Sequence, residues 1–205
     1  MNHLRKLGLG AMVLLATMAV WGVGSASATE LYKYTTPSPN DTLGVGTELR
    51  LTLAPTAGNL LIEDTWGSPF VISTCTETEL AGKTESPGGE TTHPLGALST
   101  VKFSTCTDTM TIETKGKFEV RHIAGTTNGT LYVSGLKFNF KDTFLNFQCA
   151  AVVNGYFGTL KGATSATGYA SVEVLANVER PVCGPARIKA DFTVAAPTGL
   201  IVEAK

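Results

Sequence analysis

Apolar and polar residues alternate along several stretches of the chain, which is the pattern of strands with one buried face. The longest alternating runs are 170–178 and 186–194, and shorter ones occupy 49–53, 70–78 and 118–122. A one-residue slip in 186–194 would bury its polar side chains, so we expect a fixed register there. After the first 28 residues no stretch repeats its apolar positions with the helical period, so the pattern predicts an all-β fold.

Asn-Gly pairs and isolated glycines indicate where the strands turn or bend. Asn128-Gly129 separates two alternating runs, which predicts a hairpin. Asn154-Gly155 predicts a second hairpin, and Gly135 predicts a bulge. Many short strands with turns between them are typical of two packed antiparallel sheets or of one sheet closed on itself. We expect the first, an antiparallel β-sandwich of immunoglobulin-like or jelly-roll-like type.

The first 28 residues have the pattern of a secretory signal peptide. Arg5 and Lys6 precede an apolar run from Leu7 to Val23, and Ala26-Ser27-Ala28 closes it with small side chains. The alternative is an uncleaved membrane anchor, but the run is shorter than the roughly 20 apolar residues that a spanning helix needs. We expect cleavage after Ala28, a single domain over 29–205, no membrane span in the mature chain, and an extracellular or cell-envelope location.

Composition and charge narrow the classes of partner. Charged residues make up 16% of the chain and the formal net charge is −1. Such a chain has no basic surface for a nucleic acid, and we expect no nucleic-acid partner. The abundant threonine and glycine are typical of a β-rich surface that is polar through hydroxyl groups.

Four cysteines lie in the expected mature part, at positions 75, 106, 149 and 183. An even number in a secreted chain indicates two disulfides, and three connectivities are possible. We favour Cys75–Cys106 and Cys149–Cys183. The first pair lies in two similar hexapeptides, Ser73–Thr78 and Ser104–Thr109, which predicts two strands of like pattern. No C-x-x-C pair exists, so we expect neither a metal site nor a catalytic cysteine.

Residues for catalysis are few. His93 and His122 are the histidines outside the leader, and no zinc-binding spacing or serine-nucleophile motif accompanies them. The close acid pairs are Glu63 with Asp64 and Glu77 with Glu79. Two carboxylates can hydrolyse a glycoside on a β scaffold, but the sequence does not show their spacing. We therefore expect no catalytic residues and no cofactor, and we favour a non-catalytic role while an enzyme stays open as the alternative.

Two residues are candidates for binding. Trp66 lies in a turn-like segment, where an aromatic ring could stack on a sugar or could cover the end of the core. His122 shares the inward face of its strand with Phe118 and Val120, where a histidine is usually a packed and hydrogen-bonded residue.

Several segments resemble a family of uncharacterised secreted β-rich proteins of high-GC Gram-positive bacteria. They are 82–84, 122–130, 158–162, 183–184, 190–194 and 197–200, and the resemblance covers about Val71 to Val202. It implies a secreted β-rich architecture with two disulfides and no site residues. A weaker similarity is to the secreted protein activator of alkane oxidation group, which shares the leader and the cysteine-bearing strands.

These observations predict a secreted, non-catalytic surface, matrix or ligand-binding module, with a cell-surface or matrix component or a carbohydrate among its conceivable partners. One alternative is a small hydrolase acting on polysaccharide or ester. Another is a fibre-forming subunit that assembles by strand exchange, with the N-terminal strand within 29–46 as the donor.

Overall fold

The computed structural model of the chain describes residues 28–34, 42–56, 58–65, 70–89, 92–142, 147–180 and 183–205. Residues 1–27 of the expected leader and Trp66 lie outside these residues. The described part contains strands and no helix, and no segment of it is a helix able to cross a bilayer. The strands are β1 (Thr29–Lys33), β2 (Glu48–Leu53), β3 (Leu60–Asp64), β4 (Phe70–Ser86), β5 (Gly88–Gly89), β6 (Leu95–Cys106), β7 (Thr109–Thr114), β8 (Lys117–His122), β9 (Gly129–Asp142), β10 (Phe147–Lys161), β11 (Ser171–Val178), β12 (Ala186–Ala196) and β13 (Leu200–Ala204).

The main sheet is antiparallel and closes on itself. We call each place around the closed sheet, occupied by one strand or by two strands in succession, a lane. β2 and β3 follow one another in the lane between β12 and β4, and β7 and β8 follow one another along β9. The eight lanes are therefore β2/β3, β4, β6, β7/β8, β9, β10, β11 and β12, in chain order, and β12 pairs back with β2 and β3.

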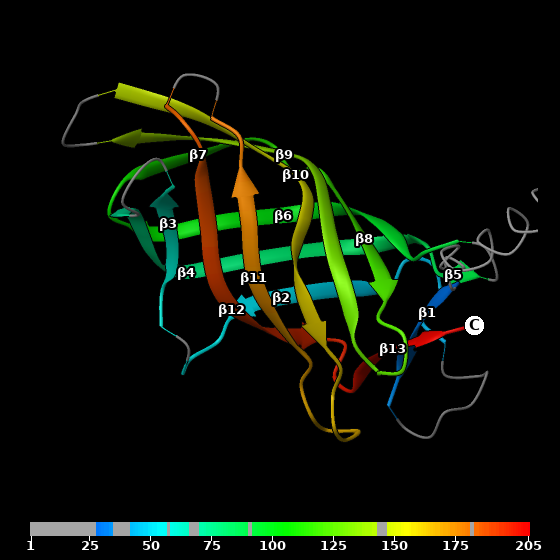
Figure 1. Cartoon of the computed structure of the whole chain (residues 1–205). Helices are drawn as coiled ribbons and strands as arrows, with labels where there is room; N and C mark the ends of the chain where they lie inside the picture. Colours follow the sequence, from blue (N-terminus) through cyan, green and yellow to red (C-terminus); the bar gives the residue numbers. More distant parts are fainter. Residues whose placement is uncertain are drawn as a thin grey trace, which may run out of the picture.

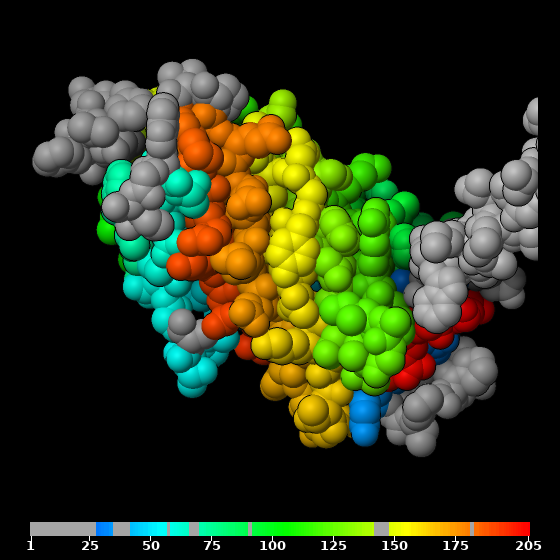
Figure 2. Space-filling model, viewed as in Figure 1, coloured from blue at the N-terminus to red at the C-terminus, as the bar shows by residue number. Residues whose placement is uncertain are grey.

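The predicted all-β antiparallel class is confirmed. Figure 1 shows two layers, in which β9 to β12 cross β2, β4 and β6 at a steep angle. Figure 2 shows the outer surface of the layer that β9 to β12 form, where these strands lie side by side. The strands of both layers belong to one closed sheet, and neighbouring lanes follow one another in chain order. Immunoglobulin-like and jelly-roll-like sandwiches instead use crossover connections between two sheets. Closure leaves fewer unpaired strand edges.

The strands with the clearest alternation have the predicted registers. In β11, Val172, Val174, Ala176 and Val178 are buried and the residues between them are not. β12 buries alternate residues from Ala186 to Val194, and its residues 186–193 pair with the whole length of β11. Burial of these two faces accounts for a large part of the core, because each fully buried aliphatic side chain contributes about 1.5–3 kcal/mol.

The two Asn-Gly pairs have different outcomes. β8 and β9 form the predicted hairpin, but the chain reverses at Gly125, which has a φ of 76°, and Gly129 already pairs with His122. The hairpin predicted at Asn154-Gly155 is wrong, because these residues lie inside β10. There the Asn154 side chain accepts a hydrogen bond of 2.7 Å from the Gly135 N–H, at the bulge predicted for Gly135. The Asn-Gly pair therefore fits a bulge and not a turn.

A small sheet covers one end of the closed sheet. β1 lies between β13 and β5, and it pairs with β13 over five residues. Figure 1 shows these three strands together at the end opposite β3. Leu31 of β1 and Leu200 and Val202 of β13 reach the main core. The strand predicted as a donor for exchange is thus paired within its own chain.

Both favoured disulfides are confirmed. Cys75 and Cys106 are directly opposite one another on β4 and β6. The hexapeptide Ser73–Thr78 lies within β4, but of Ser104–Thr109 only residues up to Cys106 belong to β6, and the chain bends at 107–108 before β7 begins, so the predicted second strand of like pattern ends at the cysteine. The Cys149–Cys183 bridge links the start of β10 to the segment that leads into β12. Among the described residues no cysteine is free.

Candidate functional site

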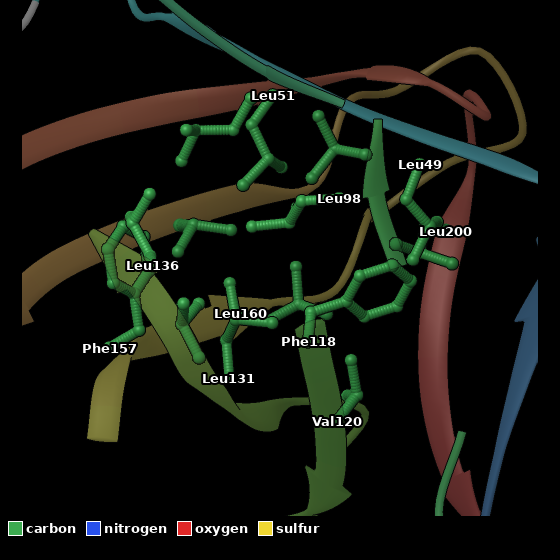
Figure 3. Close-up of a pocket in the computed structure, with 14 residues that line it drawn as sticks. Leu49, Leu51, Leu98, Phe118, Val120, Leu131, Leu136, Phe157, Leu160 and Leu200 are labelled. Atoms are coloured by element: carbon green, nitrogen blue, oxygen red, sulfur yellow. The ribbon is translucent and has the colours of Figure 1, made fainter. Parts of the chain in front are cut away.

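A cavity of about 40 Å³ lies inside the closed sheet. Figure 3 shows its lining side chains converging from several strands. All fourteen are apolar: Leu49, Leu51, Leu80, Leu98, Phe118, Val120, Leu131, Val133, Leu136, Phe157, Leu160, Val172, Val194 and Leu200. The cavity is thus an entirely hydrocarbon-lined space.

The alternation of the strands places these side chains. Each of the eight lanes contributes at least one inward residue, and Leu200 comes from β13 of the small sheet. The Phe118 ring lies against two glycines of neighbouring lanes, so close that a Cβ at Gly82 or Gly96 would collide with it. The ring therefore replaces the side chains that these two positions lack.

The lining determines which molecules the cavity can hold. It offers no hydrogen-bond donor or acceptor from a side chain, so a water molecule inside would lose its partners. An apolar group would lose nothing and would gain contact with the walls. An engineered apolar cavity of about 150 Å³ binds benzene. The smaller volume here fits a slender group, such as the end of an alkyl chain.

His122, a predicted binding candidate, lies at the end of β8 and away from the cavity lining. Its Nε2 is 2.6 Å from the carbonyl oxygen of Thr126, in the loop that joins β8 to β9. Its Nδ1 is buried and has no hydrogen-bond partner in the described structure. The backbone N–H of His122 donates to the Thr29 side chain, which His93 also contacts. These contacts join the β8–β9 loop to the end of the sheet.

Replacing His122 by alanine should lower the free energy of unfolding by about 1 kcal/mol, because one hydrogen bond is lost. Urea unfolding of the variant measures this. The affinity for an apolar ligand should stay unchanged, since His122 does not line the cavity. A large loss of ligand affinity at unchanged stability would instead assign His122 to the binding site.

Both carboxylates of the acid pair Glu63 and Asp64 form ion pairs with cations. Lys189 and Arg187 lie 2.8 and 3.2 Å from Glu63, and Arg180 lies 2.7 Å from Asp64. The hydrogen bond from Lys189 is the main cause that lowers the pKa of Glu63, and burial opposes it. A general acid of a glycosidase needs a raised pKa, so Glu63 does not suit that role.

No other described group of side chains suggests a reaction. Glu77 is exposed and Glu79 is half-buried on β4, and the described residues contain no cluster of three His, Cys, Asp or Glu side chains able to hold a metal ion. Trp66 lies outside the described residues. The cavity was not predicted from the sequence, because alternation identifies inward residues without revealing whether they fill the interior.

Comparisons of the chain with protein-family models, curated proteins and solved structures find nothing that matches. The site therefore has to be interpreted from its own geometry and chemistry.

Proposed function

We propose that the protein is an exported, non-catalytic module that binds a slender apolar ligand inside its closed sheet. The cavity lined by fourteen apolar side chains is the observation that supports this function. A closed sheet of eight strands has an interior that side chains just fill or that one small ligand occupies. The two disulfides, together with the leader pattern, support an oxidising compartment outside the cytoplasm.

The ligand is an unbranched hydrocarbon chain or a molecule that ends in one. No side chain of the lining can pair with a polar group, so burying one there would cost several kcal/mol. A polar head would have to stay at the surface while the apolar end reaches the cavity. This separates the proposed ligand from a carbohydrate, whose hydroxyl groups need hydrogen-bond partners.

A series of n-alkanols of four to twelve carbons tests this function, with binding measured by calorimetry or by methyl NMR. Each methylene that enters the cavity should lower Kd about fourfold, because burying a CH₂ contributes about 0.8 kcal/mol. The gain should stop once the cavity is full. A constant gain over the whole series would indicate partition onto the outer surface.

Two substitutions on β11 make a matched pair. Val172 and Val178 are both buried on the inward face, but only Val172 lines the cavity. Val172→Leu should fill part of the space and weaken octanol binding at least tenfold at unchanged or higher stability. Val178→Leu should leave octanol affinity unchanged while overpacking costs about 1–3 kcal/mol. Saturable binding that is equal in both variants, or no binding by the natural chain, would contradict the proposed function.

A further inference from the structure

The ladder of hydrogen bonds around the closed sheet is incomplete between β6 and β7. β6 pairs with the β7/β8 lane at only three positions, Leu95–Ala97 with Lys117–Glu119. Beyond these, residues 99–106 of β6 have ladder partners on β4 alone, and β7 pairs with β9 alone. We call this boundary, between residues 99–106 and β7, the seam.

Side chains hold the seam together in the described structure. Lys115 Nζ donates a hydrogen bond of 2.5 Å to the carbonyl oxygen of Ser99. Phe103 of β6 contacts Phe138 of β9 with 5.3 Å between the ring centroids. Phe103 and Ile112 are half-buried and pack against the core, so the seam has an apolar inner surface. Widening it would disturb these contacts without breaking a strand ladder.

The seam leads to the cavity. The lane of β7 and β8 is interrupted at Lys115-Gly116, and the Gly116 carbonyl accepts a hydrogen bond from the Leu98 N–H. Leu98 and Leu136 both line the cavity, and a Cβ at Gly116 would collide with the backbone N of Leu136. Leu98 of β6 and Leu136 of β9 therefore place the lining of the cavity next to the break between β7 and β8.

A route to the cavity from the end covered by the small sheet, past Leu200, is closed by more interactions than the seam. β13 pairs with β1 over five residues, and its Leu200 and Val202 also bond to the loops at Ala163 and Thr127. Lys205 Nζ lies 2.5 Å from Glu30, whose carboxylate also accepts a hydrogen bond from Tyr32. Burial would raise the pKa of Glu30, but these hydrogen bonds and the Lys205 charge outweigh it and lower the pKa, so the ion pair persists at neutral pH.

We propose that the seam between β6 and β7 is the port through which an alkyl chain reaches the cavity, an inference that rests on the proposed function. The chain end would pass between Phe103 and Ile112 toward Leu98 and Leu136, all of which are apolar. The small sheet of β1, β5 and β13 would remain closed. The port predicts that exchange of ligand depends on the mobility of the seam and not on that of the small sheet.

Two chemical staples test the port in the full mature protein. Ser99→Cys with Lys115→Cys, joined by a short bis-alkylating linker, closes the seam. Tyr32→Cys with Ile201→Cys, directly opposite one another on β1 and β13, fastens the small sheet by a direct disulfide, because Ile201 is buried and out of reach of a linker. The single variant Tyr32→Cys is its reference, because it has already lost the Tyr32 hydrogen bond to Glu30. The linker reacts only with the introduced thiols, because the four native cysteines are bridged. Mass spectrometry checks each product.

The measurement is the exchange rate of an octanol that ends in a CF₃ group, followed by ¹⁹F exchange NMR. The seam staple should slow association and dissociation at least tenfold at nearly unchanged Kd, and the small-sheet staple should leave both rates unchanged. Lys115→Ala, which removes the hydrogen bond across the seam, should speed both rates severalfold.

Slowing by the small-sheet staple alone, or equal slowing by both staples, would overturn the port while leaving the proposed function intact. Unchanged rates with the seam staple would do the same. Failure of the unmodified protein to bind the octanol would overturn the proposed function, and the port with it.

Discussion

Replacing Arg180 by methionine should lower the free energy of unfolding by about 3–5 kcal/mol, the cost of breaking a buried ion pair by removing one partner. The Arg180 side chain is only 3% exposed, and its Nη2 lies 2.7 Å from Asp64. Nε and Nη2 also donate to the carbonyl oxygens of Gly184 and Pro185. One guanidinium thus joins β3 to the segment that leads into β12.

Methionine keeps much of the length of the arginine side chain and its apolar stem, so the loss isolates the charge and its hydrogen bonds. Urea unfolding followed by circular dichroism measures it. The double variant Arg180→Met, Asp64→Leu should be more stable than Arg180→Met alone, because an apolar pair leaves no buried carboxylate behind.

Lys161→Met is the matched control on the surface. Lys161 and Glu173 are also close, at 2.9 Å, but both side chains are more than half exposed. Water already solvates both charges, so this substitution should not change the unfolding midpoint measurably. An equal loss in the two methionine variants would show that burial does not determine the effect at Arg180.

The sequence predicted those parts of the fold that depend on local pattern. β11 and β12 followed from alternation, because a strand with one buried face has to repeat its apolar residues every second position. The hairpin of β8 and β9 also followed, since its two strands are close in the chain. The two disulfides also followed, because each joins cysteines that are neighbours in chain order, 31 residues apart in the first bridge and 34 in the second.

The remaining features depend on contacts between distant segments. Closure of the sheet requires β12 to pair with β2, and residue pairs such as Val194 and Leu51 are separated by most of the domain. Asp64 and Arg180 meet for the same reason. The cavity depends on volumes, since an alternating pattern with slightly larger inward side chains would have predicted the same strands around a filled core. The Asn154-Gly155 pair misled because bulges and turns favour the same residues.

Removing either disulfide should destabilise the fold by about 3–4 kcal/mol, and removing both should leave the chain largely unfolded at 37 °C. Each bridge closes a loop of just over 30 residues in the unfolded chain, and its loss restores the conformational entropy of that loop. The combined loss, about 7 kcal/mol, is comparable with the 5–15 kcal/mol that stabilises a typical domain. The variants are Cys75→Ala with Cys106→Ala, and Cys149→Ala with Cys183→Ala.

The two variants separate loop entropy from local structure. The Cys75–Cys106 bridge joins β4 and β6, which a ladder already holds together, whereas Cys149–Cys183 fastens the segment that contains the Arg180 contacts. Equal losses in urea unfolding would follow from chain entropy alone. We expect limited proteolysis to cut the second variant first, near residue 183, because that segment loses its covalent link to β10. Dithiothreitol should lower the unfolding midpoint of the natural chain and leave the circular dichroism spectrum of a variant with all four cysteines replaced by alanine unchanged. An unchanged midpoint in the natural chain after complete reduction would contradict a stabilising role for both bridges.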